Sequence, residues 1–288
     1  MSHSHEEKRS SGDATEVVKT VTYRVRRYIP EQDTQPRWQD FAVPVTRGMT
    51  VLDGLGYIKE NLDSTLAWRS SCRMAVCGSC AMFINGLPRL ACETQILDLK
   101  TDVLEIAPLP NTENVRDLVP DLSRLFEKHK RTKPWLIRSD QEELDQPTAE
   151  YAQSPEELES YMQFSYCMKC ACCMAACPTL ATDPEFLGPQ PLTQAYRFTA
   201  DPRDGGFAER RDAVANADGV WKCHFAGACS EVCPKGVDPA FGNQLLKREL
   251  VFRYLKLRKD RPTSPLLAPP EGVERNPKIP EAPEPTVE

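Results

Sequence analysis

The stretch Ser71-Cys-Arg-Met-Ala-Val-Cys-Gly-Ser-Cys80 carries three of the twelve cysteines in this chain of 288 residues. Cys72, Cys77 and Cys80 follow the pattern C-x4-C-x2-C, and Cys92 is the next cysteine along the chain. Four thiolates at this plant-type spacing hold a 2Fe-2S cluster. Structural zinc sites favour pairs of short C-x2-C spacings, so a zinc site is the weaker alternative. The stretch therefore predicts a 2Fe-2S centre.

The residues around this stretch predict several strands and one helix. Alternating apolar residues predict strands over residues 20–28, 41–45, 81–84, 87–92 and 104–107. Thr50, with Asp53 three residues later, predicts the start of a helix, and Asn85-Gly86 predicts a tight hairpin turn. Strands wrapped around one helix make an α+β unit. We expect residues 17–115 to form a plant-type 2Fe-2S ferredoxin (β-grasp) domain.

A second run of cysteines has a different spacing. Cys167, Cys170, Cys173 and Cys177, followed by Pro178, give C-x2-C-x2-C-x3-C-P. In this bacterial ferredoxin signature three cysteines hold one cluster and the fourth reaches another. The run therefore predicts that a second cluster lies beside the first.

A third group completes the ligand sets. It contains Cys223, Cys229 and Cys233, with Ala226 where the signature has its second cysteine. Crossing the ligands as the signature requires gives a complete 4Fe-4S set, namely Cys167, Cys170, Cys173 and Cys233. The other set has only three members, Cys177, Cys223 and Cys229. Because the methyl group of Ala226 cannot bind iron, we expect a 3Fe-4S cluster there; a 4Fe-4S cluster with water or another side chain on its last iron is the alternative.

The twelfth cysteine, Cys172, belongs to neither set. We expect a buried thiol that packs beside the cluster as a small apolar residue. A role as a substitute ligand is the weaker hypothesis, since its neighbour Cys173 already occupies the signature position.

The second half of the chain shows helical signals. Ser154-Pro155 and Asp238-Pro239 each predict the start of a helix, and four residues of the second helix are predicted to share one face: Leu246, Leu250, Tyr254 and Leu257. We expect an all-α bacterial-ferredoxin-like domain with two clusters. The remaining boundaries divide the chain into a mobile tail over 1–16, a linker over 116–150, the helical domain over 151–260 and a proline-rich tail over 261–288.

Composition limits the possible functions. Of the residues, 40% are hydrophobic and 27% are charged, as in a soluble globular protein, and the net charge of −6 argues against a nucleic-acid partner. There is no run of 18 or more apolar residues to span a membrane, and the N-terminus does not suggest a secretory signal. In a reducing cytoplasm the cysteines are better explained as ligands than as disulfides.

Together these motifs resemble the iron–sulfur subunit of succinate dehydrogenase and fumarate reductase, over about residues 20 to 257. The resemblance is carried by Ser71-Cys72-Arg73 through Cys77-Gly78-Ser79-Cys80, Cys167 to Pro178, Tyr196-Arg197-Phe198, and Cys223-His224 through Cys233-Pro234-Lys235-Gly236. It implies a flavoprotein subunit with FAD that interconverts succinate and fumarate and passes electrons to the 2Fe-2S cluster. They would continue through 4Fe-4S and 3Fe-4S to a quinone, menaquinone or ubiquinone, at the interface with membrane anchor subunits that can carry haem b.

The resemblance also implies a quinone site and a location. Pro178 and His224 match family positions near the quinone, although Thr182 stands where many members place a tryptophan shortly after that proline. The chain is expected on the cytoplasmic face of the cell membrane, held there by anchor subunits. Basic residues of the last helix could meet anionic lipid or an anchor, but such a run is more often a solvated face.

Three functional hypotheses follow. The first is the electron-transfer subunit of succinate dehydrogenase, a succinate:quinone oxidoreductase, with fumarate reductase as the reverse direction. The second is a freestanding ferredoxin-type carrier, and the third a heterodisulfide-type or glycolate-type subunit, which would show two full signatures or lack the plant-type motif. A zinc-stabilised binding module is the weakest interpretation. No catalytic residue is expected on this chain, because it has no glycine-rich nucleotide loop and its four histidines are scattered.

Overall fold

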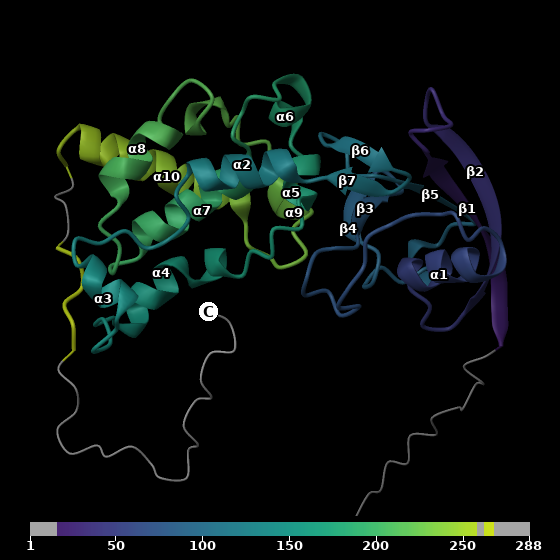
Figure 1. Ribbon diagram of the computed structural model, residues 1–288, viewed down its shortest axis with the longest axis horizontal. Coiled ribbons are helices and arrows are strands. Elements are labelled where there is room, and N and C mark those ends of the chain that lie inside the picture. Colours follow the sequence, from purple (N-terminus) through teal and green to yellow (C-terminus); the bar gives the residue numbers. More distant parts are fainter. Residues whose placement is uncertain (1–15, 258–261, 268–288) are drawn as a thin grey trace, which may run out of the picture.

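The computed structural model describes residues 16–257 and 262–267, which form a sheet-containing half and a helical half (Figure 1). The first half contains a five-stranded sheet in the order β2-β1-β5-β3-β4. Its strands are β1 (Val17–Arg27), β2 (Arg37–Thr46), β3 (Ala81–Ile84), β4 (Leu87–Leu90) and β5 (Val103–Ala107). Strand β1 pairs antiparallel with β2 and parallel with β5, while β3 pairs antiparallel with both β5 and β4.

The alternation of apolar residues in the sequence predicts which face of this sheet packs against the core. Val21, Tyr23 and Val25 of β1 are fully buried, as the period of two predicts. Helix α1 (Val51–Asn61) begins with the predicted capping box at Thr50 and Asp53. It packs so closely that a Cβ on Gly54 would lie 1.9 Å from the Tyr23 hydroxyl oxygen. Glycine is therefore required where this helix crosses the sheet.

The hairpin between β3 and β4 positions the first cysteine loop. Asn85 and Gly86 both have positive φ, 47° and 80°, which the two-residue turn requires. The Asn85 side-chain oxygen accepts a hydrogen bond of 2.8 Å from the Glu105 N–H, which ties the turn to β5. The predicted hairpin is confirmed, with Ile84 paired to Leu87.

The segment 116–150 contains regular elements. Strand β6 (Glu113–Arg116) pairs with β7 (Val119–Asp121), and helices α2 (Ser123–Arg131) and α3 (Gln141–Asp145) follow. Helix α2 packs against the helical half. The Lys128 ammonium is buried there and donates to the Pro184 and Phe186 carbonyls at 2.5 and 2.6 Å. This segment therefore fastens the two halves together.

The helical half is built around α7. Its helices are α4 (Pro155–Ser165), α5 (Cys172–Ala175), α6 (Pro178–Thr182), α7 (Pro189–Ala200), α8 (Phe207–Val214), α9 (Ala228–Glu231) and α10 (Pro239–Tyr254). Helix α7 contacts α2, α4, α8 and α10. Phe164 of α4 meets Tyr196 of α7 edge to face, with ring centroids 5.2 Å apart. The predicted helix starts at Ser154 and Asp238 are confirmed by their cap hydrogen bonds.

One predicted helical face is wrong in part. Leu246 and Leu250 of α10 are buried, but Tyr254 is 85% exposed and Leu257 is 71% exposed. The helix ends at Tyr254, so Leu257 lies beyond it. Among the described residues, none buries the side chain of Tyr254 or Leu257.

Residues 262–267, which we call the C-terminal strap, return along the helical half. The Leu267 N–H donates to the Glu150 carbonyl at 2.7 Å, and the Pro265 carbonyl accepts from the Ala152 N–H at 2.8 Å. The Ser264 N–H donates to the Pro202 carbonyl at 2.9 Å. Residues 1–15, 261 and 268–288 of the predicted tails, and residues 258–260 of the predicted helical domain, lie outside the described residues.

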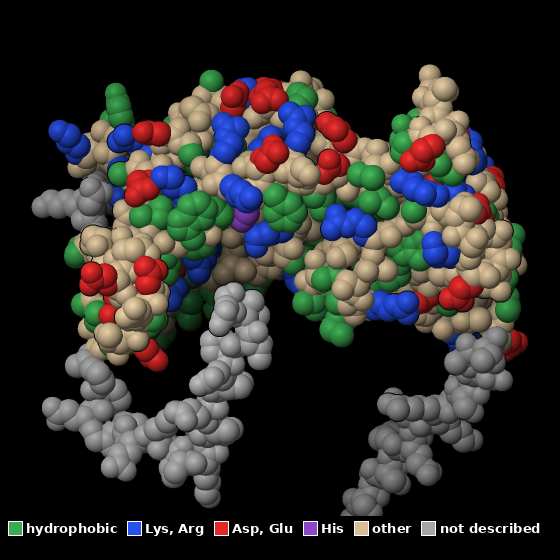
Figure 2. Space-filling view, viewed as in Figure 1, with side chains coloured by type: hydrophobic (Ala, Val, Ile, Leu, Met, Phe, Trp, Pro, Cys, Tyr) green, Lys and Arg blue, Asp and Glu red, His purple; other side chains and the backbone are tan. Residues whose placement is uncertain are grey.

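The surface mixes charges of both signs. Figure 2 shows basic and acidic side chains interspersed over one face, with hydrophobic side chains between them. Among the helices of the described residues, none has the length and hydrophobicity needed to cross a membrane.

Candidate iron–sulfur centres

The first candidate centre lies in the loop between α1 and β3. Cys72, Cys77 and Cys80 come from this loop, and Cys92 follows directly after β4. The loop turns tightly because Arg73, Ala75 and Gly78 all have positive φ, at 57°, 56° and 74°. The fold therefore brings the four predicted cysteines to one place. Cys80 and Cys92 are buried, and the other two are half-buried.

Backbone amides of this loop point at the cysteine sulfurs. Cys72 Sγ accepts from the N–H groups of Met74, Val76 and Cys77 at 3.4, 3.3 and 3.3 Å. Cys92 Sγ accepts from the Ala75 N–H at 3.3 Å. Hydrogen bonds of this kind stabilise thiolates and tune the clusters that they ligate. The loop is thus built to hold anionic sulfur.

Two of these thiols have shifted pKa values. Hydrogen bonding from Ser79, together with the Cys72 and Ser79 amides, lowers the pKa of Cys77 to about 6. Burial raises the pKa of Cys80 to about 12. Since a coordinated thiol is deprotonated outright, a bound metal would supply the positive charge that the buried Cys80 thiolate needs.

The second candidate centre is a cavity in the helical half. Its lining includes all four cysteines of the predicted 4Fe-4S set, Cys167, Cys170, Cys173 and Cys233. The Val237 N–H donates to Cys233 Sγ at 3.4 Å, and burial raises the pKa of Cys173. Two distant stretches of the chain therefore meet at this cavity, as the crossed signature predicts.

The third candidate centre is a neighbouring cavity. Its lining includes the predicted three-cysteine set, Cys177, Cys223 and Cys229, and also Ala226. Burial raises the pKa of Cys229 to about 12 and that of Cys177 in the same direction. No fourth cysteine lines this cavity, because Ala226 occupies the signature position.

The donor chemistry of all three places fits iron–sulfur clusters. Each gathers cysteine sulfurs, the ligand type that such clusters take. Across the described residues, no group of three or more His, Cys, Asp and Glu side chains is arranged for a single metal ion.

The residues predicted near a quinone also lie at the third cavity. Pro178 and His224 both line it, and both are exposed to solvent. Thr182 does not line this cavity; its hydroxyl lies 3.1 Å from the Thr179 carbonyl of its own helix, α6.

Two polar residues of these centres were not predicted from the sequence. Asn243 of α10 is buried, and its side-chain N–H lies 3.7 Å from Cys223 Sγ. The sequence offered one signal for Asn243, which lies one helical turn before Leu246 and so on the predicted buried face. A buried asparagine needs a hydrogen-bond partner. Asn111 donates to the Cys177 carbonyl at 3.2 Å, and no local pattern pointed to it.

Two sequence families match the two halves. A family described as a 2Fe-2S iron-sulfur cluster binding domain matches residues 22–127, and one described as a 4Fe-4S dicluster domain matches residues 163–237. The first range contains Cys72 to Cys92, and the second contains Cys167 to Cys233. The halves are therefore a 2Fe-2S domain and a 4Fe-4S domain.

Relatives cover most of the chain. The fumarate reductase iron–sulfur subunit of Mycobacterium tuberculosis (strain CDC 1551 / Oshkosh) is 46% identical over 236 residues, which are 82% of this chain and 95% of that protein. This chain belongs to the family of succinate dehydrogenase and fumarate reductase iron–sulfur subunits. A family member from Oryza sativa subsp. japonica, the mitochondrial succinate dehydrogenase [ubiquinone] iron–sulfur subunit 2, is 40% identical over 229 residues, which are 78% of this chain and 73% of that protein.

A solved structure of the same family shares the fold. The Mycobacterium smegmatis Sdh1 complex in the apo form matches with a TM-score of 0.72 at 27% identity, covering 82% of this chain and 97% of the matched chain. The family confirms the predicted α+β architecture and the prediction of an oxidoreductase subunit with an electron-transfer role.

Proposed function

We propose that this chain is the electron-transfer subunit of a succinate:quinone oxidoreductase that holds 2Fe-2S, 4Fe-4S and 3Fe-4S clusters. One observation carries the proposal: eleven of the cysteines gather as a set of four around one loop and as sets of four and three in two cavities. When bound, clusters of these kinds exchange single electrons, and in this order they would connect a flavin with a quinone.

The ligand assignment follows the three sets. Cys72, Cys77, Cys80 and Cys92 would hold 2Fe-2S; Cys167, Cys170, Cys173 and Cys233 would hold 4Fe-4S; Cys177, Cys223 and Cys229 would hold 3Fe-4S. The methyl group of Ala226 occupies the fourth position of the last set. Asn243 would donate a hydrogen bond to the Cys223 sulfur and so favour the anionic state of that ligand.

The partners are proposed from the exposed surfaces at the first and third centres. A flavoprotein subunit with FAD would dock beside the first centre, where Met74 and Val76 of the cysteine loop are 69% and 56% exposed. Membrane anchor subunits, which can carry haem b, would cover the third centre. The exposed Pro178 and His224 support a pocket there for menaquinone or ubiquinone. With these partners the chain would lie on the cytoplasmic face of the cell membrane.

Fumarate reduction is the alternative direction of the same relay. The 46% identity with the Mycobacterium tuberculosis subunit, which is named for fumarate reductase, favours keeping this alternative. The residues that would hold the clusters are the same in either direction.

Electron paramagnetic resonance (EPR) of the purified complex during a redox titration tests the proposal. With succinate or a quinol as donor, we expect separate signals from reduced 2Fe-2S, reduced 4Fe-4S and oxidised 3Fe-4S clusters. A chain that purifies alone, without flavoprotein or membrane proteins, would instead favour the freestanding carrier. A colourless subunit with bound zinc would overturn the proposal.

A further inference from the structure

The cysteine loops of the two domains touch at Gly78. A Cβ on Gly78 would lie 2.7 Å from the Cβ of Cys170 and 2.9 Å from its Cα. Contacts below 3.0 Å are essentially never made by real Cβ atoms, and neither Cys170 atom is the end of a flexible side chain. Gly78 therefore allows the first-domain loop to approach the second-domain loop more closely than any other residue would.

Asn111 holds the same boundary from the other side. It follows β5 and has a positive φ of 59°. Its side-chain nitrogen lies 3.0, 3.1 and 3.2 Å from the carbonyl oxygens of Met174, Ala175 and Cys177. The Met174 and Ala175 carbonyls lie at the end of helix α5, and Cys177 immediately precedes helix α6. One side chain from the first domain thus fastens the loop that carries second-domain cysteines.

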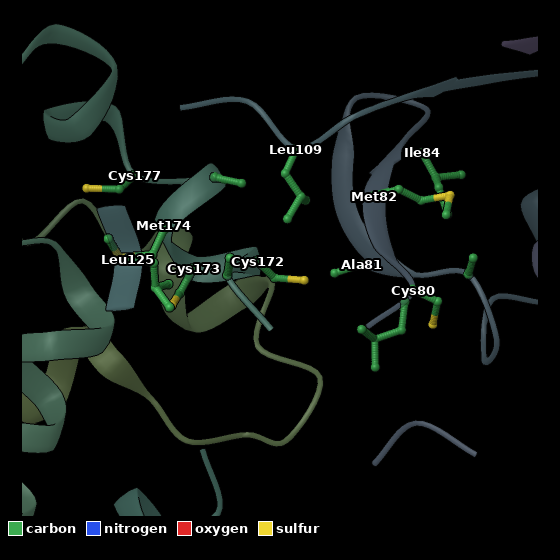
Figure 3. Packing of buried hydrophobic residues seen from close by; sticks show 14 of the residues in the cluster. Cys80, Ala81, Met82, Ile84, Leu109, Leu125, Cys172, Cys173, Met174 and Cys177 are labelled. Carbon is green, nitrogen blue, oxygen red and sulfur yellow. The ribbon is translucent and has the colours of Figure 1, made fainter. Parts of the chain in front are cut away.

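The boundary between these two contacts is closely packed. Figure 3 shows Cys172 pointing across it toward Ala81, which begins β3 directly after Cys80. Cys172 is fully buried and Ala81 is nearly so, and both belong to one apolar core that continues through the two domains. A close-packed boundary resists small displacements. The spacing of the two cysteine loops is therefore fixed.

We propose that Gly78 and Asn111 are positioning residues that set the separation of the first and second centres, so that electrons cross between the domains at the contact of Gly78 with Cys170. The inference rests on the proposed function. In this step one electron moves from the first centre to the second, and no bond or proton changes. Because electron tunnelling slows exponentially with distance, a wider separation of the two loops at this contact would lower the rate.

The first test is Gly78→Ala in the whole complex. The added Cβ must push the two loops apart, so we expect several-fold slower reduction of the 4Fe-4S centre after mixing with succinate, followed by freeze-quench EPR. The magnetic interaction between the two reduced centres should weaken as well, since it falls with distance. The matched control is Gly48→Ala, which imposes the same left-handed strain at φ 80° but has nothing within 4 Å of the new Cβ.

The second test leaves both cysteine loops unchanged. Asn111→Gly keeps the left-handed backbone without strain and removes the amide that fastens Met174, Ala175 and Cys177. We expect a weaker magnetic interaction and a slower transfer than in the parent. Lys100→Gly, at an exposed left-handed position with φ 49°, is the control for placing glycine at a left-handed residue outside the hairpin and the boundary.

The outcomes separate the inference from the proposed function. If the parent complex shows no EPR signals from 2Fe-2S and 4Fe-4S clusters, the proposed function itself is overturned. If the parent complex shows both signals, the inference alone can still fail. It fails if the magnetic interaction and the rate of 4Fe-4S reduction are unchanged in Gly78→Ala and Asn111→Gly. An equal loss in Gly48→Ala also overturns it, because backbone strain then explains the effect. If Gly78→Ala does not retain its 2Fe-2S signal, Asn111→Gly decides.

Discussion

At the scale of single residues, Ala226 determines how many ligands the third centre offers. It lines the cavity that also contains Cys177, Cys223 and Cys229. Its side chain is a methyl group, which offers iron no lone pair. We therefore expect the iron content of this centre to depend on one side chain that is not itself a ligand.

Replacing that side chain tests the three-iron assignment. In Ala226→Cys a fourth thiolate enters the cavity, so we expect one additional iron per chain and loss of the three-iron EPR signal. Iron analysis and EPR of the purified complex measure this. Cys172→Ala is the control, because Cys172 belongs to no ligand set and should leave iron content unchanged. Unaltered iron and spectra in Ala226→Cys would contradict the assignment.

A buried ion pair connects distant parts of the first domain. The Arg27 guanidinium donates to Asp117 Oδ1 at 2.9 Å and to Asp63 Oδ2 at 2.6 Å, and both Arg27 and Asp117 are shielded from solvent. Asp117 also accepts from the backbone N–H groups of Tyr28 and Ala67. Burial by itself raises the pKa of Asp63, but hydrogen bonds from Thr65 and Arg27 lower it to about 2.

Asp117→Asn would leave the Arg27 charge buried with only part of its compensation. We expect the free energy of unfolding to fall by about 3 kcal/mol, as when one partner of a buried pair is removed. Chemical unfolding of the purified subunit, followed by circular dichroism, measures the loss. Asp40→Asn removes one partner of the exposed pair with Arg24 and should cost less than about 1 kcal/mol. Equal losses in the two variants would show that burial does not strengthen the Arg27 network.

At the scale of elements, α10 divides into a packed part and a protruding end. Leu246 is buried against the core, whereas Tyr254 is exposed. Leu246→Ala should therefore lower the free energy of unfolding by about 2–5 kcal/mol through lost burial and a cavity. Tyr254→Ala, on the same helix, should change it by less than about 0.5 kcal/mol. Unfolding curves of both variants make the comparison, and a large loss for Tyr254→Ala would mean that the end of the helix is packed after all.

Local features of the elements were predictable from the sequence, whereas the ends of their packing surfaces were not. Caps at Thr50 and Ser154, the Asn85-Gly86 turn and the cysteine spacings were predictable because each is a local pattern with a local cause. The apolar period of α10 was extended too far, since periodicity shows which side of a helix is apolar and not where its packing partners end. Asn243 was missed for a related reason, because its partner is a cysteine of another segment.

At the scale of the whole molecule, the contacts between the two domains had no sequence signal. Gly78 approaches Cys170, and Asn111 reaches the end of α5, over distances in sequence that no periodicity spans. A single glycine in a cysteine loop suggests a tight turn, but it does not say what lies opposite. The two domains were therefore predictable from the sequence, but the contacts between them were not.

The C-terminal strap is another long-range feature, and it can be removed. A chain that ends after Leu257 lacks the backbone hydrogen bonds from the strap to Glu150, Ala152 and Pro202. We expect a loss of about 2 kcal/mol in the free energy of unfolding and faster proteolysis near residue 150. A chain that ends after Leu267 is the control, since it keeps these bonds and should behave like the full chain. Equal proteolysis of the two shortened chains would refute a stabilising role for the strap.

The interleaving of cysteines in the helical half has a consequence for biogenesis. Each cavity there draws on both the 167–177 stretch and the 223–233 stretch. Neither cavity can form during synthesis until residues 223–233 have left the ribosome. The loop of Cys72 to Cys92 is complete long before. The cysteines of the first set therefore become available before those of the other two sets, whose cavities are completed together.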